Sequence, residues 1–162
     1  MDHLRIPLSN SPDFALADLA DAEIVLGRNW RISQGYVVTD CVYPDKRRSR
    51  PVRMHRLLMP EHPIVDHILG DRLDNRRANL RPATHVQNIR NQKLRSDNTS
   101  GFKGVYRARG EGYWRARIKV EGKLILLGHF ATPEDASHAY DDAAQRYFGE
   151  FARTNAMLAA TG

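Results

Sequence analysis

A short stretch in the middle of the chain combines side chains that could hydrolyse a phosphodiester bond. Asp66 and His67 are adjacent, and Asn79 and Asn88 follow 12 and 21 residues after the histidine. A neutral histidine is a suitable general base near pH 7, because its ordinary pKa lies close to that value. The reaction also needs a cation beside the phosphate and a group that fixes the orientation of the base. We therefore predict a hydrolytic site with His67 as its base.

The oxygen-bearing side chains of this stretch predict a divalent metal ion. Asp66 and Asn88 offer a carboxylate and an amide oxygen, which hard cations such as Mg²⁺ or Mn²⁺ prefer as ligands. Cys41 is the only cysteine, so neither an internal disulfide nor a thiolate zinc cage can form within the chain. His85 is an alternative third ligand. We expect water and phosphate to fill the other positions around the metal.

The same residues also have purely structural interpretations. His67 could be a half-buried histidine with satisfied hydrogen bonds. Asn75, Asn79 and Asn88 could all be turn or cap residues, and for Asn75 we favour that role. The separation of Asn79 from the histidine also suits a position across a hairpin, where it would brace the loop. Arg56 is expected to contact phosphate, to pack, or to form a surface ion pair.

The elements that must position the site follow the order strand, loop, strand, helix. VDHILG (65–70) is strand-like and ends at a Gly-Asp turn signal, and LRPA (80–83) brings the chain back. Thr84 and Gln87 form a capping box, so a helix should begin there and run through HVQNIRNQKL (85–94). Neighbours on a strand point to opposite faces, so the first strand must be distorted for the adjacent acid and histidine to serve one site.

Residues 1–60 are expected to form short β elements around one helix. GYVVTDCVY (35–43) and VRMHRLLM (52–59) have the composition of strands, and a basic loop joins them. Asp18 or Asp21 could cap the helix, which is indicated by an apolar pattern with helical spacing.

Three strand-like segments and a helix follow in the C-terminal part of the chain. The segments are GVYRAR (104–109), YWRARIKV (113–120) and KLILLGHF (123–130). Thr132-Pro133 should begin the helix, and Gly149 should end it. The expected apolar face of the helix contains Ala136, Ala139, Tyr140, Ala143, Tyr147 and Phe148.

The middle strand of this group alternates between apolar and basic residues, which must point to opposite faces. The apolar set can pack on the helix and consists of Trp114, Ala116 and Ile118. The basic set forms a stripe on the open face and consists of Arg115, Arg117 and Lys119. Lys103 and either Arg107 or Arg109 are expected to extend this stripe. A cationic sheet face suits double-stranded DNA, because sheets can lie in the major groove with arginine reaching guanine edges and phosphates.

The charge of the whole chain also favours a nucleic-acid partner. The 162 residues carry a net charge of +6, with a pI of about 9.8. Basic residues concentrate in 43–95 and 103–123, and acidic residues in 132–150, a separation typical of a polyanion-binding protein. A basic surface that serves only solubility is the alternative. There is neither an apolar run of membrane-spanning length nor a signal-peptide pattern, so we expect a cytoplasmic protein without a membrane partner.

The stretches MHRLLMP (54–60) and VDHILGDRLDNRRANLRPATHVQN (65–88) resemble the HNH (ββα-metal) endonucleases, in particular the small homing endonucleases of phage introns. The resemblance implies His67 as the general base, Asp66 and Asn88 as metal ligands, and Asn79 as the structural asparagine of the catalytic set. The third motif position is asparagine rather than histidine. For this H-N-N variant we expect an oxygen-preferring metal rather than zinc.

Residues 98–155 resemble the plant ethylene-response-factor (Apetala-type) DNA-binding domain. The resemblance rests on GVY, the tryptophan-bearing strand, LLGHF, the AYDDAA helix and the closing asparagine. It implies a three-stranded antiparallel sheet backed by a helix, with DNA on the sheet. Tyr106 and Ala108 stand where plant members carry arginine, and Leu124 and Leu126 stand where they often carry arginine and tryptophan. The sequence preference of the plant domains therefore does not transfer.

These features predict an α+β protein with a nuclease module at 1–95 (core 54–95), a linker at 96–101 and a DNA-binding domain at 102–162. The predicted function is a metal-dependent DNA endonuclease of the homing type, which acts on double-stranded DNA rather than on a small molecule. The alternatives are a catalytically silent DNA-binding regulator and an RNA-binding or RNA-cleaving protein. The intact set of four polar residues argues against the first. The lack of a clear aromatic stacking pair on the sheet argues against the second.

Overall fold

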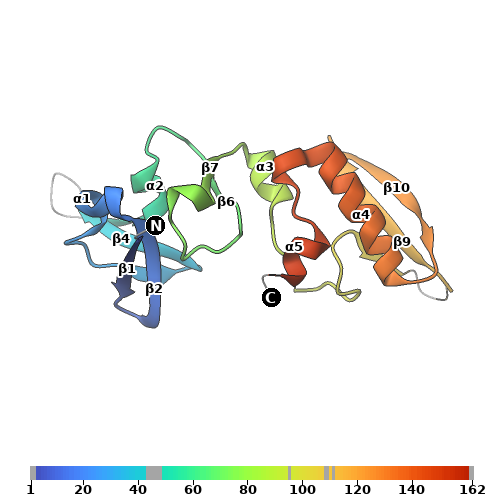
Figure 1. Ribbon diagram of the computed structural model, residues 1–162, viewed down its shortest axis with the longest axis horizontal. Helices are drawn as coiled ribbons and strands as arrows, with labels where there is room; N and C mark the ends of the chain where they lie inside the picture. The colour runs from blue at the N-terminus through green and yellow to red at the C-terminus, as the bar shows by residue number, and fades with distance from the viewer. Residues whose placement is uncertain (1–2, 43–48, 95, 108–109, 111, 161–162) are drawn as a thin grey trace. The chain divides into compact units, whose positions relative to one another are not determined.

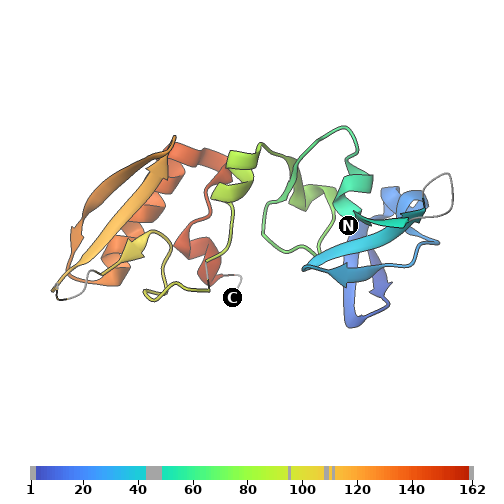
Figure 2. The same ribbon diagram turned by 180° about the vertical axis from the view of Figure 1, so that it is seen from behind.

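The computed structural model describes residues 3–42, 49–94, 96–107, 110 and 112–160 (Figures 1 and 2). The chain divides into two compact units, Met1–His85 and Val86–Gly162. Both combine small antiparallel sheets with helices, so the predicted α+β class is confirmed. The dividing point lies inside helix α3 (His85–Arg90), ahead of the predicted linker. The assignment of a nuclease module and a DNA-binding domain to these parts stays a prediction.

The first unit begins with a β-hairpin that sequence analysis did not resolve. Strand β1 (His3–Leu8) pairs antiparallel with β2 (Ser11–Asp18). Alternate apolar residues of both strands are buried in the core of this unit: Ile6, Leu8, Ala15 and Ala17. The hairpin therefore has one face toward the core, as the two-residue period of a strand requires.

The helix expected after this hairpin is much shorter than its apolar pattern suggests. It consists of the 3-10 turn η1 (Leu19–Asp21) and the four-residue α1 (Ala22–Val25). Neither Asp18 nor Asp21 caps it through its side chain. Both carboxylates instead accept hydrogen bonds from Arg77, so long-range contacts displace the expected local caps.

A three-stranded antiparallel sheet follows, in the order β3 (Arg31–Ser33), β4 (Tyr36–Val42) and β5 (Ser49–Arg53). Strand β4 matches the strand predicted over 35–43. Most of the predicted basic loop, 44–48, lies outside the described residues.

The strand predicted over 52–59 is wrong from Met54 onward, where helix α2 (Met54–Leu58) forms. Met54, His55 and Leu58 are all buried. One face of a helix accommodates this spacing, whereas a strand would turn the first two of these residues to opposite faces. Short apolar runs do not distinguish the two structures by pattern alone.

Strands β6 (Val65–His67) and β7 (Leu80–Pro82) form the two-stranded ribbon around the predicted site. Asp66 pairs with Arg81 in the antiparallel register. Strand β6 is shorter than predicted because the chain turns directly after it, with the Gly70 amide donating to the His67 carbonyl at 2.8 Å. The turn η2 (Arg77–Asn79) leads back into β7.

The second unit confirms the predicted three-stranded sheet backed by a helix. Strands β8 (Val105–Tyr106), β9 (Trp114–Val120) and β10 (Lys123–Phe130) form an antiparallel sheet with β9 in the middle. Helix α4 (Pro133–Phe148) covers one face of it (Figures 1 and 2). The core between them includes Val105, Ala116, Ile118, Ala136, Tyr140 and Ala144.

The ends of α4 follow the predicted signals. The Thr132 side chain accepts a hydrogen bond from the Asp135 amide at 3.1 Å, and Gly149 at the C-terminus has a positive φ of 54°. The expected apolar face needs one correction, because Tyr147 is 41 % exposed whereas Ala144 is fully buried. Residue 144 lies one helical turn beyond Tyr140 and thus on the same face.

The chain continues through η3 (Gly149–Phe151) to α5 (Asn155–Ala159). Asn155 connects α5 to the segment that precedes β8, since its Oδ1 accepts a hydrogen bond from the Lys103 amide at 2.6 Å. The Asn155 amide group and backbone both donate to Asp141 of α4. Among the described residues, no helix has the length and apolar character needed to span a membrane.

Candidate active site and nucleic-acid interface

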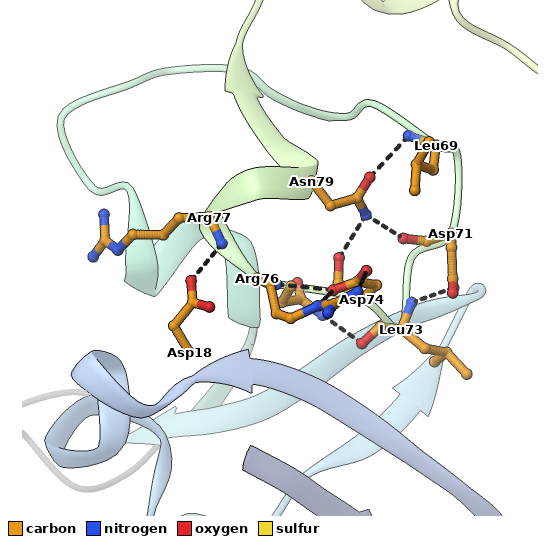
Figure 3. Close-up of polar contacts among 9 residues, drawn as sticks. Asp18, Leu69, Asp71, Leu73, Asp74, Arg76, Arg77 and Asn79 are labelled. Atoms are coloured by element: carbon orange, nitrogen blue, oxygen red, sulfur yellow. Dashed lines mark hydrogen bonds and ion pairs between the residues drawn. The ribbon is translucent and has the colours of Figure 1, made fainter. Parts of the chain in front are cut away.

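Asn79 forms hydrogen bonds that hold the loop between β6 and η2 (Figure 3). Asn79 Oδ1 accepts a hydrogen bond from the Leu69 amide at 2.8 Å. Its Nδ2 donates to the carbonyls of Asp71 at 3.2 Å and Asp74 at 2.7 Å. The side chain is buried, and its polar atoms bridge the loop at three points. Asn79 therefore fixes the path of the chain directly after His67.

The N-terminal hairpin supports the same loop from outside. The Leu16 amide donates to the Leu73 carbonyl, and the Asn75 amide donates to the Leu16 carbonyl, both at 2.8 Å. Asp18 accepts from the Arg77 amide at 2.7 Å, as Figure 3 shows. The first residues of the chain thus help to position the candidate site, a contribution that no local sequence pattern indicates.

His67 is the last residue of β6, and its imidazole is buried. Its Nε2 lies 3.3 Å from Asn75 Oδ1. Burial lowers the pKa of His67 below its ordinary value, although Asn75 and the nearby Asp66 oppose this effect. The imidazole is therefore neutral near pH 7, which is the form that a general base requires.

Asn75 influences which nitrogen of His67 carries the proton. Its Nδ2 donates to the carbonyls of Arg72 and Leu73, both at 3.2 Å, so its Oδ1 faces the imidazole. An amide oxygen can only accept, so this contact favours the tautomer with the proton on Nε2 and the lone pair on Nδ1. Asn75 is thus a positioning residue for His67. Sequence analysis gave it only a turn role, because the reason for its identity is a contact across the loop.

Two further rings pack around His67. The ring centroid of His55 lies 5.0 Å away in an edge-on arrangement, and that of Tyr36 lies 6.2 Å away. Burial lowers the pKa of His55 to about 3, with smaller contributions from its coupling to His67 and from the charges of three arginines. His55 is therefore neutral near pH 7 and packs beside His67 as an aromatic ring. The guanidinium carbons of Arg53 and Arg72 lie 4.0 and 4.1 Å from the Tyr36 ring centroid.

Asp66 forms a buried ion pair with Arg81 across the ribbon. The Asp66 Oδ2 atom accepts from Arg81 Nε at 3.1 Å and from Nη2 at 2.9 Å. Both side chains are buried. The guanidinium thus fixes the orientation of the carboxylate that immediately precedes His67.

The other predicted ligands lie on or beside α3. Asn88 belongs to the second unit, where it is partly buried, and His85 is exposed at the end of the first unit. Within the part of the chain that the structure describes, no group of three or more His, Cys, Asp or Glu side chains could hold a metal ion. The predicted ligand pair, Asp66 and Asn88, contains only one side chain of these four types and therefore does not meet this criterion. The role of Asn88 stays a prediction from the resemblance.

Arg56 bonds to the backbone within the first unit, and its predicted contact with DNA phosphate stays a prediction. Its Nη1 donates to the carbonyl of His62 at 2.9 Å and also to the carbonyl of Pro63. These bonds tie α2 to the segment that enters β6, so the guanidinium supports the chain path beside the site.

If His67 is the base of a nuclease, we predict that Asn75→Ala lowers the single-turnover rate of DNA cleavage by about 10- to 100-fold, the range seen when a partner that orients a metal-ligating residue is lost. The cause would be a His67 ring without a fixed tautomer. Imidazole ¹⁵N shifts should report a single Nε2-protonated form in the parent protein and a mixture in the variant. Asn10→Ala, which removes a side chain bonded to Ile32 far along the sequence, is the control. A parent protein with Nδ1 protonated would contradict this role.

A row of basic side chains lies on the sheet face opposite α4. Arg117 and Lys119 of β9 are exposed and alternate with the buried Ala116 and Ile118. Arg115 is partly buried, and its Nη2 donates to the Tyr113 hydroxyl at 3.2 Å. The Arg117 guanidinium carbon lies 4.2 Å from the centroid of the Tyr106 ring. This face is therefore cationic, with its arginines held against aromatic rings.

Lys103 and Arg107, the expected extension of the row, have contacts within the second unit, and their predicted contact with DNA stays a prediction. The Lys103 ammonium donates to the carbonyls of Arg90 at 2.7 Å and Gln92 at 2.9 Å, and burial lowers its pKa to about 8. It thus holds the segment after α3 and is not an open cation. The Arg107 guanidinium carbon instead lies 5.6 Å from the ring centroid of Trp114, which packs against the core. Arg109 lies outside the described residues.

Comparison with known proteins agrees with both resemblances. The chain is 29 % identical over 168 residues to an uncharacterized HNH endonuclease of Acanthamoeba polyphaga mimivirus, covering 91 % of this chain and 87 % of that protein. It is 37 % identical over 65 residues to Protein 3.8 of Escherichia phage T7, covering 40 % of this chain and 54 % of that protein. No family model matches the chain.

The plant resemblance covers a smaller part of the chain. The ethylene-responsive transcription factor ERN3 of Medicago truncatula is 44 % identical over 71 residues, which are 43 % of this chain and 29 % of the plant protein. The chain thus spans less than a third of that protein's length. The predicted similarity to HNH endonucleases and to ethylene-response-factor domains is confirmed.

Proposed function

We propose that this chain is a metal-dependent endonuclease that hydrolyses phosphodiester bonds of double-stranded DNA. The observation that carries the proposal is the buried imidazole of His67, hydrogen-bonded to Asn75 beside a loop that Asn79 braces. The similarity to a viral HNH endonuclease supports it. A homing role and a place in the cytoplasm of a host cell follow from the resemblance and belong to the same proposal.

In this proposal His67 accepts a proton from water at Nδ1, because its Nε2 already directs a proton at Asn75. The water oxygen bonds to phosphorus, and the bond from phosphorus to the leaving oxygen breaks. Asn79 contributes by holding the loop that contains Asn75, so that the hydrogen bond to His67 survives the approach of DNA. In this proposal the imidazole of His67 has the orientation and the protonation state of a general base before substrate binds.

The donor chemistry of Asp66 and Asn88 fits a hard divalent cation, since both offer oxygen atoms. The Asp66 carboxylate accepts two hydrogen bonds from Arg81, so a metal at this carboxylate would share it with the guanidinium. When bound, Mg²⁺ or Mn²⁺ would neutralise charge on the phosphate and on the leaving oxygen.

We further propose that the open face of the β8–β10 sheet binds double-stranded DNA through Arg115, Arg117 and Lys119. The separation of charge across this unit supports the assignment. The basic row lies on one face of the sheet, whereas α4 on the other face carries Glu134, Asp135, Asp141 and Asp142. Such a unit orients its cationic face toward a polyanion.

The double substitution Arg115→Ala/Arg117→Ala should weaken DNA binding and flatten its dependence on salt. Each phosphate contact that the substitutions remove should reduce the slope of log K against log salt by about 0.9. The single-turnover rate on saturated DNA should not change, because neither residue is assigned to the chemical step. Binding titrations at several salt concentrations measure this. Arg146→Ala, which removes a cation from the exposed side of α4, is the control. Unchanged affinity and slope in the double variant would show that DNA binds elsewhere.

A further inference from the structure

The cationic sheet face also exposes two large aliphatic side chains. Leu124 and Leu126 of β10 are 58 % and 53 % exposed. The residues that alternate with them, Ile125 and Leu127, pack toward α4. The two leucines therefore point away from the core, on the same face as the basic row. Their exposure shows that the core of this unit does not require aliphatic side chains at these positions.

Each leucine lies directly beside a cation. In the antiparallel register of β10 and β9, Leu124 pairs with Lys119 and Leu126 pairs with Arg117. Opposite residues on one face of such a pair have their Cβ atoms about 4.5–5.5 Å apart. A ligand that covers the leucines must therefore also meet positive charge. A purely apolar protein surface would leave these cations desolvated and without partners, at a considerable cost.

The major groove of B-DNA offers the complementary arrangement. Its rims carry phosphates, and within it each thymine presents a C5-methyl group at the base edge. Two residues along a strand span about 6.7 Å, which is close to the rise of two base-pair steps at about 3.4 Å each. Leu124 and Leu126 thus have a spacing that suits methyl groups two steps apart, while Lys119 and Arg117 face the backbone or guanine edges.

We propose that Leu124 and Leu126 read the C5-methyl groups of pyrimidines in the major groove and give the target site a thymine requirement. The inference rests on the proposed binding of DNA by this sheet face and deepens it. The arginines and the lysine supply affinity, and the leucines supply discrimination by removing the thymine methyl groups from water.

The test begins with the full-length protein and a random pool of duplex DNA, in chelator to prevent cleavage. The best-bound duplex is then synthesised in two forms, one with thymine and one with uracil, which differ only in the C5-methyl group. We expect the uracil duplex to bind about fourfold more weakly for each methyl group that a leucine covers in the thymine duplex, and thus about 15-fold more weakly when both leucines are engaged.

The variant Leu124→Ala/Leu126→Ala distinguishes direct contact from an effect of uracil on DNA shape. In this variant the thymine and uracil duplexes should bind with equal affinity. Met157→Ala, which truncates another exposed apolar side chain on α5, should keep the full difference. A thymine-to-uracil ratio that is unchanged in the double leucine variant would overturn the proposal, as would a selection without sequence preference.

Binding titrations of the arginine variant and of the thymine and uracil duplexes show which of the two proposals is wrong: DNA binding by the sheet, or the methyl readout. If Arg115→Ala/Arg117→Ala weakens binding but the two duplexes bind the parent protein equally, the sheet binds DNA and only the methyl readout is wrong. If the arginine variant binds as the parent does, the sheet is not the DNA surface, and both the proposed DNA binding by the sheet and the methyl readout fail.

Discussion

Replacement of His67 by alanine is expected to lower the single-turnover rate of DNA strand cleavage by about 10²–10⁴-fold. This is the usual contribution of a general base. The affinity for DNA should change little, because it depends on phosphate contacts spread over the basic surface. The imidazole is buried and its neighbours Asn75, His55 and Tyr36 hold it, so alanine leaves a gap and no other base in the same position.

The measurement is a cleavage time course at saturating protein, with a binding titration on the same duplex. His138→Ala is a matched control, because His138 is exposed on α4 and is not part of the candidate site. A circular dichroism spectrum like that of the parent would show that the His67 variant is folded. Parent-like cleavage by a folded His67→Ala protein would rule out this residue as the base.

Gly104→Ala is expected to destabilise the second unit by about 2–5 kcal/mol, which combines left-handed backbone strain with overpacking. Gly104 has a φ of +76°, and an added Cβ would overlap the ring of Tyr140. It would also lie 2.8 Å from the Arg117 carbonyl oxygen. The Gly104 carbonyl accepts from the Arg117 amide at 2.9 Å, so the backbone has little freedom to move away.

Urea unfolding followed by tryptophan fluorescence measures this effect, since Trp114 packs against the core of the unit. Gly101→Ala separates the two causes, because Gly101 has a similar φ of +79° but nothing within 4 Å of the added Cβ. The Gly101→Ala substitution should lower the free energy of unfolding by only about 1–2 kcal/mol, from backbone strain alone. Equal losses in the two variants would mean that the Tyr140 contact does not restrict this position. DNA binding should decline with the folded fraction, because the same unit carries the basic row.

The sequence was informative where a residue's role depends on near neighbours. The β8–β10 sheet and α4 were predictable because the central strand β9 alternates between apolar and basic residues, and because Thr132 and Gly149 mark the ends of α4. Asn79 was predictable as a residue across a hairpin, since the two strands of that hairpin are close in sequence. Such features need only local geometry and spacing.

Roles that depend on distant partners were not predictable. Asn75 looks like an ordinary turn residue until its contact with His67 is known. Lys103 looks like an exposed cation, although its ammonium bonds to two carbonyls that precede it by more than ten residues. Asp18 and Asp21 look like helix caps, yet both bond to Arg77. In each case a long-range hydrogen bond outweighs the local preference.

Incubation of supercoiled plasmid with the full-length protein tests the central claim most directly. The account predicts nicked or linear DNA in Mg²⁺ or Mn²⁺, no cleavage with excess chelator, and loss of cleavage in the His67→Ala variant. Binding measured in the chelator should persist, since the basic row of the sheet does not require the metal. Binding without cleavage in any divalent metal would identify a catalytically silent DNA-binding protein, and cleavage that survives the chelator would contradict the metal-dependent mechanism.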